Sequence, residues 1–122
     1  MMLTVLKAKI QEVRVTESDT NYPGSIAIPE ELLIASGIRQ FEQVYVNNKT
    51  NGNRIITYAV KSKARGFVSV NGAASKQFSK GDVIHILAYA QLQETEAATF
   101  QPTLVITDQD NNLVEEKPYA LY

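Results

Sequence analysis

The chain contains one histidine and no cysteine, and this limits the chemistry that its side chains can perform. A Ser-His-Asp triad needs a histidine beside its nucleophile, and zinc sites use several His or Cys ligands. The single imidazole, His85, lies in the apolar stretch 83–87 and is interpreted as a strand residue on the polar or interface side. Neither a GxGxxG fingerprint nor a P-loop is present. The sequence therefore predicts no metal site and no phosphate-binding loop.

Two clusters combine chemically useful side chains with turn or strand patterns. Residues 22–25 (YPGS) place the Ser25 hydroxyl after a glycine in a turn, which on its own is ordinary turn chemistry. Residues 51–58 (NGNRIITY) read as a turn followed by a strand, so Arg54 and Tyr58 share one face and Thr57 lies on the other. Taken singly, these are ordinary solvent-facing or half-buried strand residues.

In a third cluster, residues 70–74 (VNGAA), Asn71 is followed by one glycine and two alanines. Such small residues allow a ligand or a second backbone to approach closely. The alternative interpretation is a tight turn with small packing residues. Each cluster alone therefore leaves its function open.

The hydrophobic pattern predicts a scaffold made mainly of short strands. A bend or bulge is expected near Gln11 and Glu12, where the alternation of apolar and polar residues is imperfect. The pair Asn51-Gly52 predicts a hairpin between the strands that flank it. Strands are expected over residues 3–16, 25–28, 44–46, 54–60, 67–70, 83–92 and 104–107.

One helix is predicted over residues 29–37, because Pro29 suits a first turn, acidic residues follow it and Gly37 favours a C-terminal stop. A helical turn is expected over 94–100. The polar residues 17–21 are expected to form a turn, and residues 108–122 a polar, mobile tail. Short strands with one or two short helices favour a small β-barrel, in a single domain of residues 1–122, over a parallel α/β sheet.

The bulk composition indicates a folded protein without an obvious charged partner. The chain has 122 residues, of which 44% are hydrophobic and 20% charged, which is ordinary for a globular domain. A net charge of −1 gives no electrostatic reason to expect nucleic acid or an anionic membrane as partner. No stretch approaches the roughly 18 apolar residues of a membrane span, and residues 1–9 do not read as a signal peptide. The lack of cysteine fits a cytoplasmic location.

Taken together, and in this order, the clusters resemble the pyruvoyl-dependent aspartate 1-decarboxylases of pantothenate biosynthesis. The resemblance covers about residues 1–92 and implies a double-psi β-barrel. It also implies a cytoplasmic homotetramer with active sites between neighbouring subunits. The matching elements are Lys9 on the first strand, YxGS at 22–25, the helix after it, NGxRxxTY at 51–58 and VNGAA at 70–74.

This resemblance implies an autocatalytic cleavage between Gly24 and Ser25, into a β chain of residues 1–24 and an α chain of residues 25–122. The Ser25 Oγ attacks the Gly24 carbonyl, elimination releases the Gly24 carboxylate, and hydrolysis leaves a pyruvoyl group and frees ammonia. Gly24 is expected to give the attacking hydroxyl room and to allow a strained backbone. Thr57 is the implied oxyanion donor. The uncut chain is then a zymogen that needs neither pyridoxal phosphate nor metal.

The implied activity is that of a lyase that converts L-aspartate to β-alanine and CO2. Loss of CO2 leaves a carbanion, and a Schiff base between the substrate amine and the pyruvate-derived group supplies the electron sink. Tyr58 is the implied proton donor. Arg54 would grip a substrate carboxylate with two hydrogen bonds, and Lys9 would add a second positive charge. The other implied substrate-binding residues are Thr57, Asn71, Gly72, Ala73 and Ala74.

One position departs from the family pattern. Many members carry a histidine two residues after the strand lysine, where this chain has Gln11, which cannot titrate and is left out of the catalytic set. Two other interpretations stay open. The chain could be an uncut binding or regulatory barrel without enzymatic activity, or an enzyme that needs a maturation partner.

Overall fold

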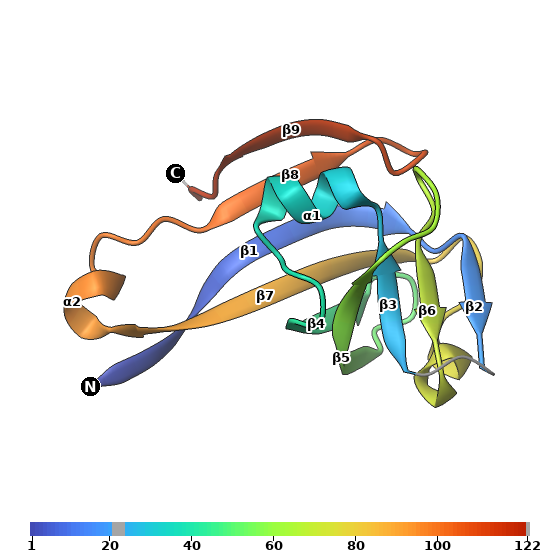
Figure 1. The fold of residues 1–122 in the computed structure, drawn as a ribbon, viewed down its shortest axis with the longest axis horizontal. Coiled ribbons are helices and arrows are strands. Elements are labelled where there is room, and N and C mark those ends of the chain that lie inside the picture. The colour runs from blue at the N-terminus through green and yellow to red at the C-terminus, as the bar shows by residue number, and fades with distance from the viewer. Residues whose placement is uncertain (21–23, 122) are drawn as a thin grey trace.

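The computed structural model describes residues 1–20 and 24–121. Within these ranges the strands form one nine-stranded sheet in the order β2-β6-β3-β5-β4-β7-β1-β8-β9 (Figure 1). The chain runs through β1 Met2–Arg14, β2 Glu17–Asp19, β3 Ser25–Ile28, α1 Glu30–Ser36, β4 Gln43–Asn48, β5 Arg54–Lys61, β6 Ser69–Asn71, the 3-10 helix η1 Ala73–Gln77, β7 Val83–Gln93, α2 Glu94–Ala97, β8 Thr103–Thr107 and β9 Leu113–Pro118.

This architecture confirms the prediction of a mainly β protein, and it fits a small β-barrel. The sheet is mixed, because β3 pairs parallel with β5 and antiparallel with β6, while β1 pairs antiparallel with β7 and parallel with β8. The two α-helices are short, as expected. In the part of the chain that the structure describes, no helix is long and apolar enough to cross a membrane.

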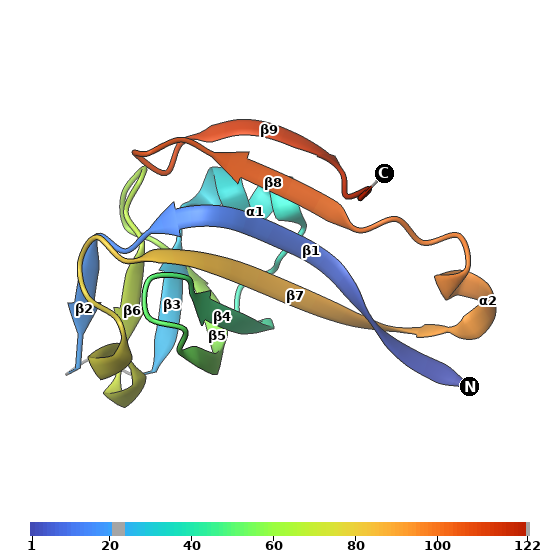
Figure 2. The same ribbon diagram turned by 180° about the vertical axis from the view of Figure 1, so that it is seen from behind.

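Strands β1 and β7 form a long ribbon that extends beyond the rest of the sheet. The N-terminus and α2 lie at its far end (Figures 1 and 2). The pairing register shifts between Ile10 and Val13, where Glu12 has a positive φ of 57°. The predicted bulge near Gln11 and Glu12 is therefore confirmed. A bulge of this kind bends its strand and increases the local twist.

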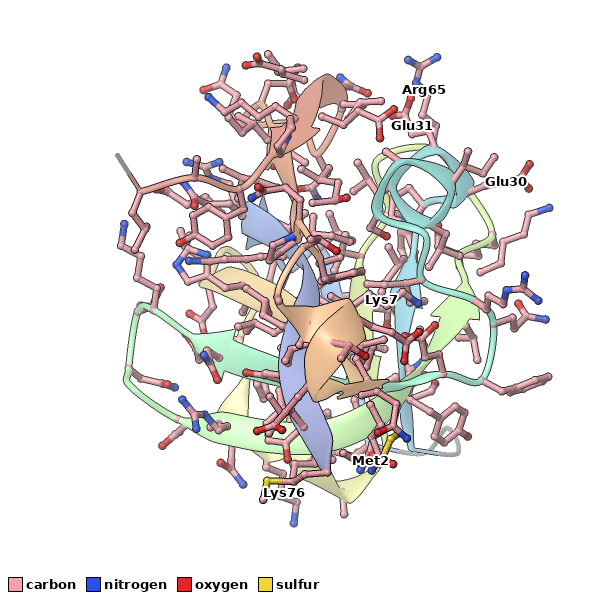
Figure 3. All side chains as sticks on the ribbon, turned by 90° about the vertical axis from the view of Figure 1, so that its left-hand side faces the viewer. Met2, Lys7, Glu30, Glu31, Arg65 and Lys76 are labelled. Carbon is pink, nitrogen blue, oxygen red and sulfur yellow. The ribbon has the colours of Figure 1, made fainter. Side chains whose placement is uncertain are left out.

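Helix α1 begins and ends where its sequence predicts. Pro29 occupies the N-cap position, and Gly37 closes the helix in the left-handed conformation with φ of 73°, which glycine adopts without steric cost. At the first turn, Glu31 points toward Arg65 (Figure 3) and forms an ion pair with it at 3.6 Å. The same Glu31 carboxylate accepts a hydrogen bond from the backbone N–H of Leu113 at 3.3 Å, which ties α1 to β9.

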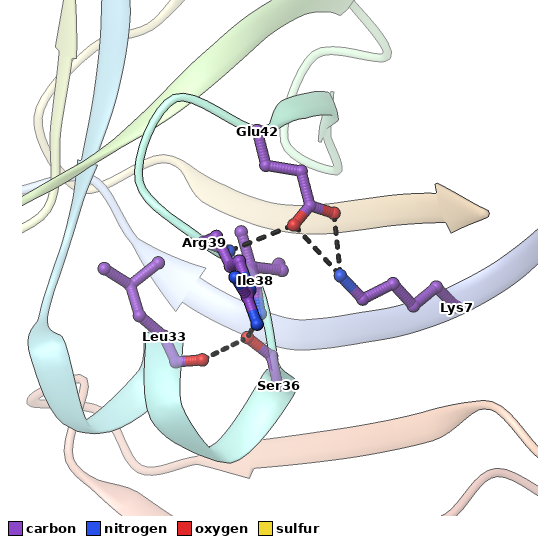
Figure 4. Close-up of polar contacts among 6 residues, drawn as sticks. All are labelled: Lys7, Leu33, Ser36, Ile38, Arg39 and Glu42. Carbon is purple, nitrogen blue, oxygen red and sulfur yellow. Dashed lines mark hydrogen bonds and ion pairs between the residues drawn. The ribbon is translucent and has the colours of Figure 1, made fainter.

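The segment after α1 is fixed to β1 by a second polar cluster (Figure 4). The Lys7 ammonium contacts both carboxylate oxygens of Glu42, at 2.9 and 3.0 Å, and the backbone N–H of Arg39 donates to the same carboxylate. The Ser36 hydroxyl donates to the Leu33 carbonyl and accepts from the Ile38 N–H. These bonds satisfy polar groups at the end of α1 and set the path of the chain into β4.

The core lies inside the curled sheet and under α1. Buried and more accessible residues alternate along β4 and β7, as expected for strands with one face inward. Complete burial of each large aliphatic side chain contributes about 1.5–3 kcal/mol. The largest fully buried side chains are Ile10, Ile26, Ile28, Leu32, Ile84, Ile86, Val13, Val15, Val44, Val46, Val68 and Val70.

Two polar segments differ from the sequence prediction. Residues 17–21 were expected to turn, but Glu17–Asp19 forms β2 and pairs parallel with β6. The expectation of a mobile tail from residue 108 is wrong over Leu113–Pro118, which pairs antiparallel with β8 as strand β9. Asn111, buried before β9, bonds to the Arg14 backbone and to the Gly66 carbonyl. Backbone pairing extends both segments, and Leu113 of β9 also packs against the core.

Candidate active site

A cleft with a volume of about 410 Å³ opens where β3, β5 and β6 lie side by side. Three residues from the sequence-predicted site line it, namely Ser25 from β3, Tyr58 from β5 and Asn71 from β6. The other polar residues that line the cleft are Glu17, Asp19, Lys61, Ser62, Lys63 and Ser69. The order of the strands, β6-β3-β5, places Ser25 between the other two predicted residues and explains how positions far apart in sequence meet.

Ser25 lies at the boundary between the surface and the cleft. It is the first residue of β3 and only 5% exposed, whereas Gly24 before it is exposed. A Cβ built on Gly24 would meet no atom of the described residues within 4 Å. The neighbouring Tyr22 and Pro23 of the motif lie outside the described residues.

A chain of buried hydrogen bonds reaches the Ser25 hydroxyl. The Ser69 hydroxyl donates to Asn71 Oδ1 at 2.6 Å, and Asn71 Nδ2 donates to Ser25 Oγ at 3.1 Å. All three residues are at most 8% exposed. Ser25 pairs with Asn71 across the β3–β6 ladder, so the two side chains leave the sheet on the same side. The arrangement supplies a fixed donor at the atom that would act as nucleophile.

Tyr58 contributes an acid–base group to the other side of the cleft. The residue is half-buried on β5, and its ring packs on Phe41 with 6.3 Å between centroids. Thr57, the neighbour of Tyr58, points to the other face of β5, pairs with Val44 across the β4–β5 ladder and is not among the described residues that line the cleft. Thr57 and Tyr58 therefore lie on opposite faces of β5.

The remaining predicted residues lie off the cleft in the described part of the chain. Gly72 is buried with φ of 83°, and its N–H donates to the Asp19 carbonyl at 2.7 Å. Ala73 and Ala74 begin η1. Gly72 therefore shapes the chain beside the Asn71 amide and does not itself line the cavity.

Lys9 and Arg54 belong to a separate polar region on the outer face of the sheet. We call Lys9, Asn47, Arg54 and His85 the outer patch. Asn47 pairs with both Arg54 and His85, and Arg54 Nε donates to Asn47 Oδ1 at 2.7 Å. Lys9 stands one row away, opposite Leu87, with Nζ 5.7 Å from the centroid of the Tyr119 ring. None of the four lines the Ser25 cleft among the residues described.

Comparison with known proteins identifies the family. A sequence model described as aspartate decarboxylase matches residues 1–114. The chain belongs to the aspartate decarboxylase family. It is 48% identical over 114 residues to an aspartate 1-decarboxylase of Stenotrophomonas maltophilia (strain R551-3), which covers 93% of this chain and 90% of the relative. It is 42% identical over 120 residues to one of Methylobacillus flagellatus, which covers 98% of this chain and 95% of that protein.

Two features of this aspartate decarboxylase family member were not assigned a role from its sequence. Ser69 stands two residues before Asn71 on the same strand, so strand periodicity places both side chains on one face, and this signal could have found it. His85 was interpreted as a strand residue on the polar or interface side, and it is half-buried on the outer face, beside Asn47. Among the described residues, no group of three or more His, Cys, Asp or Glu could hold a metal ion.

The His85 imidazole has a defined hydrogen-bonding state. Its Nδ1 accepts the backbone N–H of Glu12 at 3.1 Å, so the proton of the neutral ring sits on Nε2. Partial burial lowers the pKa of His85 from 6.5, and the charge of Lys9 lowers it further; the Glu12 carboxylate raises it and Lys49 lowers it. The balance favours the neutral ring in the folded protein.

We expect this shift to make the protein less stable as the pH falls. The unfolded chain takes up the His85 proton near pH 6.5, before the folded chain does, so protons favour unfolding below that pH. The His85→Asn variant keeps an acceptor for the Glu12 N–H but cannot titrate. Melting temperatures between pH 7 and pH 5 should fall more steeply for the natural protein than for His85→Asn. Parallel curves would show that His85 contributes nothing to the acid sensitivity.

Proposed function

We propose that the chain is an aspartate 1-decarboxylase that converts L-aspartate to β-alanine and CO2 and serves pantothenate biosynthesis. Relatives with this name match more than nine-tenths of its length. The structural observation that carries the proposal is the Ser25 hydroxyl, buried at the start of β3 beside an exposed Gly24 and held by an Asn71 donor. By resemblance to the family, this serine is the residue from which the carbonyl group would form.

The residues around Ser25 fit a pyruvoyl group made from that serine. Ser25 faces a cleft large enough for a small diacid, and the Asn71 amide is already directed at its side chain. When present, the pyruvoyl carbonyl supplies the electron sink that decarboxylation requires. Tyr58 lines the same cleft, where its phenol can deliver the proton that replaces CO2.

The substrate carboxylates need cations, and the cations of the predicted site lie on the outer patch. Arg54 is exposed and Lys9 half-buried, both away from the cleft of their own chain. This separation supports a homotetramer in which the outer patch of one subunit covers the Ser25 cleft of the next. Arg54 then binds a carboxylate with its planar fork, and Lys9 adds a compact second charge.

The proposal also includes the processing and location of the enzyme. The chain is expected to be cut between Gly24 and Ser25 into fragments 1–24 and 25–122, to act in the cytoplasm and to use no metal. Thr57 is proposed to assist the cut as the donor to the oxyanion. A maturation factor is a further expected partner where cleavage of the purified chain is slow.

Intact mass under denaturing conditions tests this function. We expect fragments 1–24 and 25–122, the second lighter by one ammonia than a fragment beginning with serine, and release of CO2 from aspartate. A single uncut mass that persists on warm incubation, together with no CO2 release, would favour the alternative of a binding or regulatory barrel. Cut protein without CO2 release would contradict the substrate assignment and leave the processing intact.

A further inference from the structure

We infer that Ser69 is a positioning residue for self-cleavage, acting through the Asn71 amide. The inference rests on the proposed function and assigns Ser69 a task that the family motif does not. Ser69 is 4% exposed, lines the cleft and donates its hydroxyl proton to Asn71 Oδ1 at 2.6 Å. This is the short end of the range for hydrogen bonds between neutral groups.

The bond from Ser69 holds the Asn71 side chain with its Nδ2 toward Ser25. An amide has a carbonyl oxygen at one corner and an NH2 group at the other, and a half-turn about its axis exchanges them. With Oδ1 held by Ser69, Nδ2 must point to Ser25 Oγ, to which it donates at 3.1 Å. Without that hold, Asn71 can turn and offer Oδ1 to the serine hydroxyl instead.

The orientation matters because charge develops on Ser25 Oγ. In the first step the bond from Oγ to the Gly24 carbonyl carbon forms and the bond from that carbon to the Ser25 nitrogen breaks. The hydroxyl proton ends on the released amine. A donor on Oγ stabilises negative charge as the hydroxyl loses its proton, and it stabilises the same oxygen when it leaves within the Gly24 carboxylate. An amide turned the other way would place an acceptor there and stabilise neither.

The structure also offers a way to distinguish the positioning role of Ser69 from a contribution to packing alone. Ser69 and Asn71 are two residues apart on β6, so both side chains leave the strand on one face, toward β3. Ser75 offers a matched control, because its hydroxyl is 1% exposed and has no hydrogen-bond partner among the described residues. Removing it deletes a buried serine hydroxyl on η1, the element after β6, without touching the Asn71 amide.

The test measures the rate of self-cleavage by intact mass, starting from freshly made uncut chain. We expect Ser69→Ala to slow cleavage about tenfold, the scale of one positioned hydrogen bond, and Asn71→Ala about a hundredfold, the scale of an oxyanion donor. Ser69→Thr keeps the hydroxyl and should cleave within about twofold of the natural chain, as should Ser75→Ala.

A double-mutant cycle decides whether Ser69 acts through Asn71. The combined Ser69→Ala, Asn71→Ala chain should cleave no slower than Asn71→Ala alone, because the amide that Ser69 orients is absent. Independent, additive effects would overturn the inference, as would unchanged cleavage in Ser69→Ala or slow cleavage in Ser69→Thr with an unaltered melting temperature. Failure of the natural chain itself to cleave would count against the proposed function as well, and is distinguishable from these results.

Discussion

Replacing Ser25 by alanine should leave a single uncut chain of residues 1–122 that releases no CO2 from aspartate. The hydroxyl is the only atom of this side chain that can attack the Gly24 carbonyl, and the α chain cannot gain a carbonyl group without that attack. The expected loss is complete, since no other buried group in the described cleft can form the electron sink. Intact mass and CO2 release measure the two effects separately.

The Ser25→Ala experiment needs proof that the variant is folded. Its mutation removes the acceptor of the Asn71 Nδ2–H bond but leaves the β3 ladders to β5 and β6 in place. The far-ultraviolet circular dichroism should therefore match that of the natural chain. Decarboxylation by a folded, uncut Ser25→Ala chain would show that the reaction does not depend on a group derived from Ser25.

Replacing Tyr58 by phenylalanine should leave processing intact and lower turnover by about 10²- to 10⁴-fold, the usual contribution of a positioned general acid. Phenylalanine keeps the ring that packs on Phe41, so the cleft should hold its shape. Only the phenolic hydroxyl is lost. The fragment masses check processing, and kcat for aspartate measures the effect.

Tyr89→Phe is the matched control for Tyr58→Phe. Tyr89 lies on β7, outside both the Ser25 cleft and the outer patch, and its ring packs edge-on against Tyr45 with centroids 5.0 Å apart. Loss of its hydroxyl should leave kcat within about twofold of the natural enzyme. Normal turnover in Tyr58→Phe would remove this residue from the role of proton donor and direct attention to another group in the cleft.

The sequence pattern predicted correctly those elements that are determined by residues within or next to them. Pro29 and Gly37 marked the two ends of α1, and the imperfect alternation near Glu12 marked the bulge in β1. Strands β2 and β9 could not be found in this way. Strand β2 is polar throughout, and β9 has only Leu113 and Val114 as large apolar residues. Both segments are extended because they pair with β6 and β8, which is a property of the assembled sheet.

The sequence allowed the residues of the candidate site to be named, but it did not allow their positions in space to be predicted. The ordered motifs pointed to Ser25, Tyr58 and Asn71, and these three residues line the same cleft. The same motifs also pointed to Arg54 and Lys9, although both residues lie on the outer patch of this chain. A sequence motif indicates which residues belong to one active site. Only the order of the strands shows which of these residues lie close together within one chain. In the proposed homotetramer, contacts between subunits would bring these cations to the cleft.

The position of the proposed cut within the sheet has a consequence for how the mature protein refolds. The cut falls before β3, and fragment 1–24 keeps β1, which lies between β7 and β8 in the sheet. The fragments should stay together in native buffer, because the same ladders and core hold them. Once unfolded, they must find each other again by diffusion. Recovery then depends on protein concentration, whereas the uncut precursor chain forms these pairings within one molecule. Cleavage thus converts an intramolecular folding problem into a bimolecular association, and a cut chain that has dispersed at low concentration loses its route back.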